Sequence, residues 1–181
     1  MASLRILLRE DELHQGVVRM AGEITAHYRD RPLTIVGVLT GSIVLLADLI
    51  RELEMPLRLA LVQARSYRGR STTPSNLSLN ADSLLDVKDR EVLVVDDIFD
   101  TGRTLFELVS RLDELQVASL RSAVLLRKQG RQQVARGPDF VGFDIPDEFV
   151  VGYGLDFDDM YRNLPYLAVL EPGDLQDERP A

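Results

Sequence analysis

The 181-residue chain contains no cysteine, no tryptophan and only two histidines. Without cysteine it can form no disulfide and offers no thiolate as a nucleophile or metal ligand. His14 and His27 have no second histidine or cysteine at metal-ligand spacing, so we interpret both as surface residues. These absences exclude disulfide-stabilised scaffolds, cysteine enzymes and zinc sites built from cysteine and histidine.

Long apolar runs and blocks of basic residues are also missing. The longest apolar run, around Ile43–Leu49, is interrupted by Asp48, and the short run near the N-terminus meets acidic residues at 10–12 without a cleavage site. The net charge of −8 gives no electrostatic basis for non-specific binding to nucleic acid or to an anionic membrane. We therefore expect a cytoplasmic protein with neither a membrane nor a nucleic acid as partner.

What is present is the composition of an ordinary globular protein, with 45% hydrophobic and 28% charged residues. The length suits one well-buried domain and is short for two, and no internal repeat or low-complexity linker divides the chain. We expect a single domain over residues 1–181, in which the polar, proline-containing tail 173–181 is disordered.

Apolar residues at helical spacing alternate along the chain with short apolar runs rich in β-branched residues. The predicted elements are, in order, a helix over 11–28, a strand over Thr34–Leu39, a helix from Ile43 to about Leu53, a strand over Leu57–Ala64, a strand over Val92–Val95, a helix over Thr104–Leu115, a strand over Leu120–Leu126, β-like runs over Phe140–Ile145 and Phe149–Tyr153, and a last short strand over Tyr166–Leu170. This alternation favours an α/β fold with a mainly parallel sheet.

The chain is organised around residues 91–105, which read EVLVVDDIFDTGRTL. The run Val92–Val95 predicts a strand buried on both faces of a parallel sheet and ending at the acidic pair Asp96 and Asp97. A polar loop containing Gly102 then leads into a helix, whose N-terminus aims unpaired backbone N–H groups at an anion. Glycine lets the backbone approach closely, and the flanking threonines add hydroxyl donors. The stretch therefore predicts a phosphate cradle.

Three carboxylates, Asp96, Asp97 and Asp100, stand beside this cradle and would repel a bare phosphate. They could accept hydrogen bonds from sugar hydroxyls, or hold Mg²⁺ that bridges phosphate oxygens. Such a combination suits a ribose phosphate. Two other interpretations are an acidic turn that caps the next helix and a signalling receiver domain. In a receiver, however, the acidic pair should end the first strand, and here it ends the third.

Two further segments belong to the same predicted edge of the sheet. Thr40, Gly41 and Ser42 follow a predicted strand, and this second strand–loop–helix unit fits either another phosphate site or an ordinary tight turn. Lys128 follows a later strand. Because ligands of open α/β sheets bind beyond the carboxyl ends of the strands, it would reach the same crevice as Asp100. A lysine at a strand end also fits a solvated surface charge.

Residues 65–83, RSYRGRSTTPSNLSLNADS, interrupt the alternating pattern. The segment contains Gly69 and Pro74, is rich in serine and threonine, and has little apolar content. A loop of this length inside a compact domain is usually functional, so we predict a flexible lid that includes Ser66 and Tyr67. A solvated hairpin would explain the composition but not the length.

Residues 92–104 resemble the phosphoribosyl-diphosphate-binding motif of type I phosphoribosyltransferases: four apolar residues, two acids, two apolar residues, then Asp-Thr-Gly-basic-Thr. Pro138–Arg162, PDFVGFDIPDEFVVGYGLDFDDMYR, resembles the C-terminal region of hypoxanthine-guanine phosphoribosyltransferases. With Ser66–Tyr67, the resemblance covers most of residues 34–170. It implies the type I phosphoribosyltransferase fold: a mainly parallel sheet flanked by helices, a small C-terminal hood region and a flexible lid loop.

The activity implied by the resemblance is purine salvage. An Mg²⁺-dependent enzyme would transfer the 5-phosphoribosyl group from phosphoribosyl diphosphate to hypoxanthine or guanine, giving IMP or GMP and diphosphate. Lys128 and the stretch Phe149–Asp156 favour a 6-oxopurine. The alternatives are a related phosphoribosyltransferase for xanthine, or one for uracil with a regulatory RNA-binding role. A homo-oligomer, either dimer or tetramer, is expected.

The resemblance also implies a phosphoribosyl site. Asp96 and Asp97 match residues that contact the ribose hydroxyls directly or through Mg²⁺, and Asp156 matches a carboxylate that helps to hold a second Mg²⁺. Asp100 matches the proposed general base toward a purine ring nitrogen. The cradle of the 5′-phosphate matches Asp100, Thr101, Gly102, Arg103 and Thr104.

Sites for the base and for the leaving group follow from the same resemblance. Lys128 matches a lysine that donates to the purine 6-oxo group, and Phe149 matches an aromatic residue that stacks on the base. The purine site comprises Lys128, Phe149, Val150 and Asp156. The diphosphate site comprises Leu39, Thr40, Gly41, Ser42 and Arg162. Many relatives carry lysine at the position of Thr40, so this chain lacks a cation there; the family also tends to use a cis peptide in this loop.

Overall fold

The structure, a computed structural model, describes residues 4–64, 77–78 and 87–171. The helices of this part are α1 (Glu10–Tyr28), α2 (Ile43–Leu49) and α4 (Arg103–Asp113). The strands are β1 (Arg5–Leu8), β2 (Leu33–Leu39), β3 (Leu57–Ala64), β4 (Leu77–Ser78), β5 (Glu91–Phe99), β6 (Ser119–Lys128), β7 (Phe140–Ile145), β8 (Val150–Val151) and β9 (Leu167–Val169).

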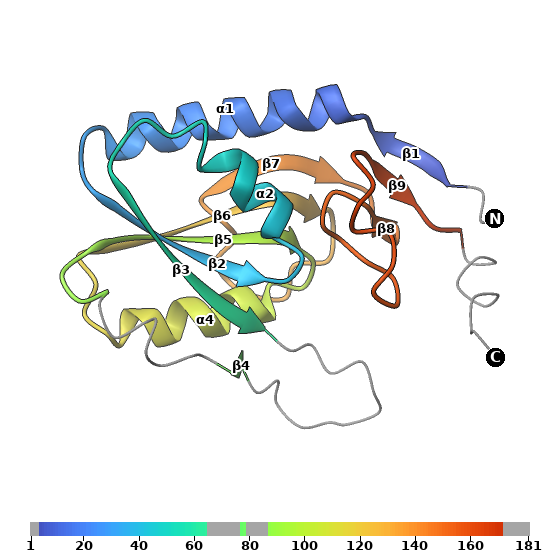
Figure 1. The fold of residues 1–181 in the computed structure, drawn as a ribbon. Coiled ribbons are helices and arrows are strands. Elements are labelled where there is room, and N and C mark those ends of the chain that lie inside the picture. The colour runs from blue at the N-terminus through green and yellow to red at the C-terminus, as the bar shows by residue number, and fades with distance from the viewer. Residues whose placement is uncertain (1–3, 65–76, 79–86, 172–181) are drawn as a thin grey trace.

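A six-stranded sheet in the order β4-β3-β2-β5-β6-β7 forms the centre of the fold (Figure 1). The five strands from β3 to β7 in this order run parallel, and the two-residue β4 pairs antiparallel with β3 at the edge. α1 and α2 cover one face of the sheet, and α4 covers the other (Figure 1). The predicted α/β fold, a mainly parallel sheet flanked by helices, is therefore confirmed.

β5 supplies side chains to two hydrophobic cores. Leu93 and Val95 belong to the core beneath α1 and α2, whereas Val92 and Val94 belong to the core beneath α4. All four side chains are fully buried. Successive residues of a strand point to opposite faces, so an unbroken apolar run is what a sheet covered on both sides requires. The position of β5 puts the loop that follows it at the middle of the sheet's carboxyl edge.

The central strand is longer than predicted. β5 continues through the acidic pair to Phe99, because Asp96, Ile98 and Phe99 all pair with residues of β6. The prediction that the strand ends at the acidic pair is therefore wrong. The interpretation of the pair as a turn that caps the next helix is wrong for the same reason.

The predicted helices also differ from the observed ones at their ends. α2 ends at Leu49, not at about Leu53, because the N–H groups of Arg51 and Glu52 bond to carbonyls three residues back and the chain continues in turns. α4 begins one residue earlier than predicted and ends at Asp113.

A second, three-stranded sheet joins the two ends of the described chain. β1 pairs antiparallel with β9, which pairs antiparallel with β8, in the order β1-β9-β8 (Figure 1). The sequence predicted short strands near β8 and β9 but none at β1. The omission has a physical reason: four residues carry little periodicity, and the register Arg5↔Val169 depends on a partner at the other end of the chain. This sheet forms the C-terminal hood.

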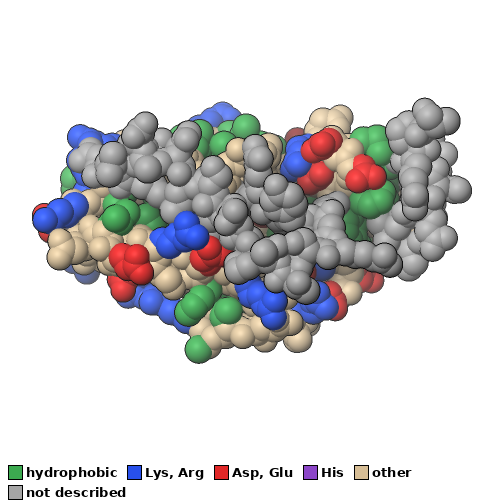
Figure 2. Space-filling view, turned by 90° about the horizontal axis from the view of Figure 1, so that it is seen from below, with side chains coloured by type: hydrophobic (Ala, Val, Ile, Leu, Met, Phe, Trp, Pro, Cys, Tyr) green, Lys and Arg blue, Asp and Glu red, His purple; other side chains and the backbone are tan. Residues whose placement is uncertain are grey.

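Most of the predicted lid, 65–83, lies outside the described residues, including Ser66 and Tyr67, and so does the predicted tail 173–181. In the part that the structure describes, no helix is long and apolar enough to cross a membrane. Figure 2, viewed from below, shows acidic and basic side chains interspersed on the face toward the viewer. The expected absence of a nucleic-acid partner stays a prediction.

Candidate active site

The loop after β5 turns at Gly102 to begin α4. Gly102 is the N-cap residue with a φ of 84°, a left-handed conformation that favours glycine. A Cβ atom there would lie 2.5 Å from the ring of Phe99 and 2.6 Å from Val134. Thr101 Oγ1 accepts a 3.4 Å hydrogen bond from the N–H of Arg103. The first N–H groups of a helix have no partner inside it, so the loop and the first turn offer donors to an anion.

The acidic pair lies in β5, immediately before this loop. Asp96 is buried and Asp97 is partly buried. Asp96 Oδ1 accepts a 3.0 Å hydrogen bond from the N–H of Asp97, and Asp97 Oδ1 accepts a 2.8 Å bond from the N–H of Ile98. Burial, followed by the neighbouring Asp97 carboxylate, raises the pKa of Asp96 well above its ordinary value. Burial also raises the pKa of Asp97. The carboxyl groups of Asp96 and Asp97 therefore lie close together where little water reaches them.

This donor set fits Mg²⁺. Magnesium is bound through one or two carboxylates, with waters and substrate phosphates completing an octahedron. Asp96 and Asp97 supply such a pair of carboxylates. Among the described residues, no group of three or more His, Asp or Glu side chains could hold a metal by itself. The arrangement therefore suits a cation shared with a phosphorylated substrate, not one caged by protein alone.

The loop after β2 lies against the acidic pair. A Cβ atom on Gly41 would come within 1.6 Å of Asp97 Oδ2, so any larger residue would have to displace the Asp97 carboxylate. The peptide bond between Leu39 and Thr40 is cis, as the resemblance implied. The fully buried Ser42 donates its hydroxyl to the carbonyl of Val38, which commits that hydroxyl to the fold.

Two other predicted residues, Asp156 and Arg162, form an ion pair of 2.9 Å beside this loop. Arg162 Nη1 also donates to the carbonyl of Gly154 at 2.8 Å. Gly154 in turn touches Gly41, since a Cβ on Gly154 would lie 2.2 Å from the Gly41 carbonyl oxygen. The positive charge of Arg162 acts on Asp97 and partly opposes the rise in its pKa. The predicted diphosphate residues and the acidic pair are thus brought together.

The structure also brings Lys128, a predicted purine residue, close to Asp100, the predicted general base. Lys128, at the end of β6, has only 11% of its side chain exposed, and its Nζ lies 3.9 Å from Asp100 Oδ2. Arg131 donates from Nε to Asp100 Oδ1 at 2.8 Å. Asp147 lies 3.5 Å from Lys128 and 3.6 Å from Arg131. We call these four residues the ion cluster.

Two members of the ion cluster, Arg131 and Asp147, were not among the residues that the sequence predicts for the site. Arg131 follows three residues after Lys128, and its charge was the available signal. Asp147 comes close because β6 and β7 pair in parallel with Lys128 opposite Ile145, so the residues after both strands meet at one edge. Only that register gives Asp147 its place.

The aromatic residue predicted to stack on the base lies just before β8. The ring of Phe149 meets that of Phe157 edge to face, with 5.7 Å between the centroids. Val150 is buried in the hood. A second aromatic ring, that of Phe157, thus helps to position Phe149, and no motif in the sequence indicated this contact.

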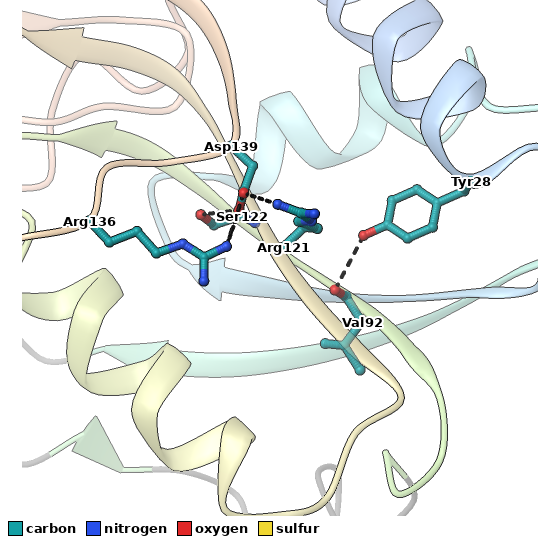
Figure 3. A network of polar contacts seen from close by, with 6 residues as sticks. All are labelled: Tyr28, Val92, Arg121, Ser122, Arg136 and Asp139. Carbon is teal, nitrogen blue, oxygen red and sulfur yellow. Dashed lines mark hydrogen bonds and ion pairs between the residues drawn. The ribbon is translucent and has the colours of Figure 1, made fainter.

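A separate polar network lies at the other end of β6 (Figure 3). Asp139 accepts hydrogen bonds from Arg121 at 2.7 Å, from Arg136 at 3.0 Å and from the N–H of Ser122 at 2.9 Å. Burial by itself would raise the pKa of Asp139, but these hydrogen bonds outweigh it and lower the pKa. In the same view, the Tyr28 hydroxyl points to the carbonyl of Val92. This network ties β6 to the chain before β7, away from the ion cluster.

Comparison with known proteins places this geometry in a family. The phosphoribosyl transferase domain matches residues 5–158. The chain is 38% identical to hypoxanthine-guanine phosphoribosyltransferase of Staphylococcus epidermidis over 166 residues, which is 92% of this chain and 93% of the relative. It is 35% identical to that of Staphylococcus aureus over 167 residues, 92% and 93% of the two chains.

Solved structures agree with the sequence comparisons. A hypoxanthine-guanine phosphoribosyltransferase of Bacillus anthracis matches with a TM-score of 0.86 and 33% identity, covering 94% of this chain and all of the other. A hypoxanthine phosphoribosyltransferase of Trypanosoma cruzi in a ternary substrates complex has a TM-score of 0.86 and 34% identity, covering 96% and 97% of the chains. The chain therefore belongs to the phosphoribosyltransferase family, in its hypoxanthine-guanine branch.

Proposed function

We propose that this chain catalyses Mg²⁺-dependent transfer of the 5-phosphoribosyl group from phosphoribosyl diphosphate to hypoxanthine or guanine, releasing diphosphate and IMP or GMP. The observation that carries the proposal is the convergence of Asp97, Gly41 and Arg162 beside the loop that contains Asp100. The residues that we propose for the sugar, the anion and the base come from the carboxyl ends of β2, β5 and β6 and from the hood beside them. The named activities of the relatives support the same reaction.

Residues of the central stretch bind the sugar phosphate in this proposal. The loop amides, Thr101, Gly102, Arg103 and Thr104 hold the 5′-phosphate. Asp96 and Asp97 accept from the ribose hydroxyls or hold Mg²⁺, with Asp156 contributing to a second ion. When bound, Mg²⁺ supplies positive charge that stabilises the departing diphosphate. Leu39, Thr40, Gly41, Ser42 and Arg162 surround that diphosphate.

A second group of residues holds the purine base. Lys128 donates a hydrogen bond to the 6-oxo group, Phe149 stacks on the ring, and Val150 and Asp156 supply backbone contacts. Asp100 accepts the proton of a purine ring nitrogen while that nitrogen attacks C1 of the sugar. The segment with Ser66 and Tyr67 closes over the substrates and excludes water, which would otherwise compete for the activated sugar.

A homo-oligomer and a cytoplasmic location complete the proposal. Leu59 and Leu61 project from the face of β3 that carries Leu57, yet remain 45% and 40% exposed. Paired apolar side chains on a sheet face are the kind of surface that a second copy would cover. The substrate and product are polyanions, and a bilayer core strongly disfavours charge, so they stay in the compartment that contains them. We propose that this compartment is the cytoplasm.

The test is a diphosphate-release assay with phosphoribosyl diphosphate and each free base in turn. We expect turnover with hypoxanthine and guanine and almost none with adenine, because an amino group at position 6 would face the Lys128 donor with another donor. Excess chelator should abolish the turnover. Equal turnover with adenine would contradict the purine site, and efficient use of uracil alone would favour the uracil alternative.

A further inference from the structure

The ion cluster contains two cations and two carboxylates whose contacts are unequal. Arg131 holds Asp100 at 2.8 Å, whereas its distance to Asp147 is 3.6 Å. Lys128 lies 3.9 Å from Asp100 and 3.5 Å from Asp147. The shortest ion pair therefore belongs to a residue without a role in the proposed reaction.

The two oxygens of Asp100 have different surroundings. Oδ1 accepts the hydrogen bond from Arg131 Nε. Oδ2 faces Lys128 Nζ at 3.9 Å, which is beyond hydrogen-bond distance. The hydrogen bond from the guanidinium engages Oδ1 and leaves Oδ2 as the oxygen with room for a proton.

Resting on the proposed function, we propose that Arg131 is a positioning residue for Asp100 and that Asp147 takes over its guanidinium when Asp100 is protonated. In this step the purine N–H bond breaks and the proton passes to Asp100 Oδ2. The nitrogen electron pair forms the bond to C1 of the sugar. The C1–O bond breaks, and its electron pair leaves with diphosphate.

Charge balance explains the role of Asp147. Before the transfer, two positive and two negative side chains make the ion cluster neutral. Protonation of Asp100 removes one negative charge, and both cations then have Asp147 as the remaining carboxylate of the cluster. Asp147 already lies within 3.6 Å of each cation, so a small side-chain movement is enough to make the exchange. Exposed side chains change rotamer quickly, on a picosecond-to-nanosecond scale.

The first experiment compares Arg131→Ala with the parent in the diphosphate-release assay. We expect kcat to fall about 10-fold or more, the effect of losing one charge-assisted hydrogen bond. The KM values for hypoxanthine and phosphoribosyl diphosphate should change little, because Arg131 acts through Asp100. Arg131→Lys should recover part of kcat by retaining the charge. Unchanged kcat in Arg131→Ala would overturn the positioning role.

Arg127→Ala is the matched control. Like Arg131, Arg127 is partly exposed and pairs with a carboxylate: it forms hydrogen bonds of 2.6 and 2.9 Å with Asp144. It precedes Lys128 in β6 and is not a member of the ion cluster. It should retain the parent kcat. Thermal unfolding of both arginine variants checks that any difference in kcat does not come from lost fold.

A double-mutant cycle separates positioning from direct action on the substrate. If Arg131 acts through Asp100, Arg131→Ala should cost much less in an Asp100→Asn background than in the parent. Equal losses in both backgrounds would overturn the proposal.

Asp147→Asn tests the exchange, with Asp144→Asn as its control. We expect a lower kcat at unchanged KM for Asp147→Asn alone, because protonated Asp100 then leaves both cations without a carboxylate in the cluster. A parent-like kcat would overturn the part assigned to Asp147. Failure of the parent itself with both oxopurines would contradict the proposed function, whereas an active parent with an unaffected Arg131 variant would contradict only this inference.

Discussion

Asp100 is the proposed general base, and the alternative is that it only caps the N-terminus of α4. A helix N-cap at Asp100 would be served almost as well by asparagine. In the structure the N-cap of α4 is Gly102, which has no side chain, and the N–H of Arg103 at the start of the helix bonds to Thr101 Oγ1 and not to Asp100. The carboxylate of Asp100 is directed at Arg131 and Lys128 instead. The capping role is therefore wrong.

The first prediction follows from this geometry. Asp100→Asn should lower kcat by ~10²–10⁴ if the carboxylate is the general base. Its melting temperature should stay near that of the parent, because the residue does not cap α4. Steady-state kinetics with hypoxanthine and a thermal melt measure the two quantities. A parent-like kcat in this variant would contradict the role of Asp100 as general base.

Lys128 supports the second prediction at the residue scale. Its side chain is 11% exposed, so the ammonium group is held at the end of β6 and not spread into solvent. Lys128→Ala should raise the KM for hypoxanthine and guanine by about 10-fold or more, the effect of losing a hydrogen bond from a charged donor. The KM for phosphoribosyl diphosphate should change much less. A larger change for phosphoribosyl diphosphate than for the base would argue against contact with the 6-oxo group.

At the scale of elements, the hood has to be fixed to the main sheet for the two halves of the site to face each other. Besides the hydrophobic core that hood residues share with α1 and α2, two contacts between described residues contribute to this. Gly154 lies against the carbonyl of Gly41, and Tyr153 donates its hydroxyl to Asp48 Oδ2 in α2. Burial, together with the hydrogen bond to Asp48, raises the pKa of Tyr153, so the hydroxyl keeps its proton and acts as a donor at any ordinary pH.

The third prediction concerns this attachment. Tyr153→Phe removes the hydroxyl and leaves Asp48 without its donor, so the free energy of unfolding should fall by about 1–3 kcal/mol. Urea unfolding followed by circular dichroism measures the change. Tyr166→Phe, a partly exposed tyrosine of the same segment, is the control and should unfold like the parent. Equal stability of Tyr153→Phe and the parent would mean that the hydroxyl does not hold the hood.

At the scale of the whole molecule, the network around Asp139 should make one contribution to the dependence of stability on pH (Figure 3). The hydrogen bonds from Arg121, Ser122 and Arg136 hold the pKa of Asp139 below its ordinary value. A carboxyl group whose pKa is lower in the folded chain contributes stability above the pKa of the unfolded chain, about 3.9. That contribution is lost as the pH falls through the lower pKa of the folded state.

The fourth prediction follows from that sign. Asp139→Asn should cost about 1–3 kcal/mol of unfolding free energy at pH 7 and much less at acidic pH, where the parent's carboxyl is itself protonated. Urea unfolding at pH 7 and at a series of acidic pH values, down to the lowest at which the parent stays folded, measures how this difference shrinks. Comparing variant with parent cancels the contributions of the other acidic groups. A cost that does not shrink in acid would show that the charge of Asp139 is not what matters.

What the sequence alone determined are the features carried by contiguous residues. The run Val92–Val95, the loop with Gly102 and the following helix each depend on neighbours along the chain, and the structure has all three. Alternating strands and helices likewise predicted the parallel sheet. Local periodicity and backbone preference are enough to predict such features. A strand covered on both faces needs apolar residues at successive positions, and a tight turn with positive φ favours glycine.

Features that join distant segments of the chain are visible only in the folded protein. β1 became a strand because β9 lies beside it, and β5 extends to Phe99 because β6 continues the ladder. The contact of Gly41 with Asp97 and the place of Asp147 beside Lys128 depend on how strands are ordered and registered. Hydrogen bonds and ion pairs between remote residues leave no local pattern in the sequence. The physical reason is that such contacts form only when the strands pack into the sheet. Strand order and register then decide which remote residues become neighbours.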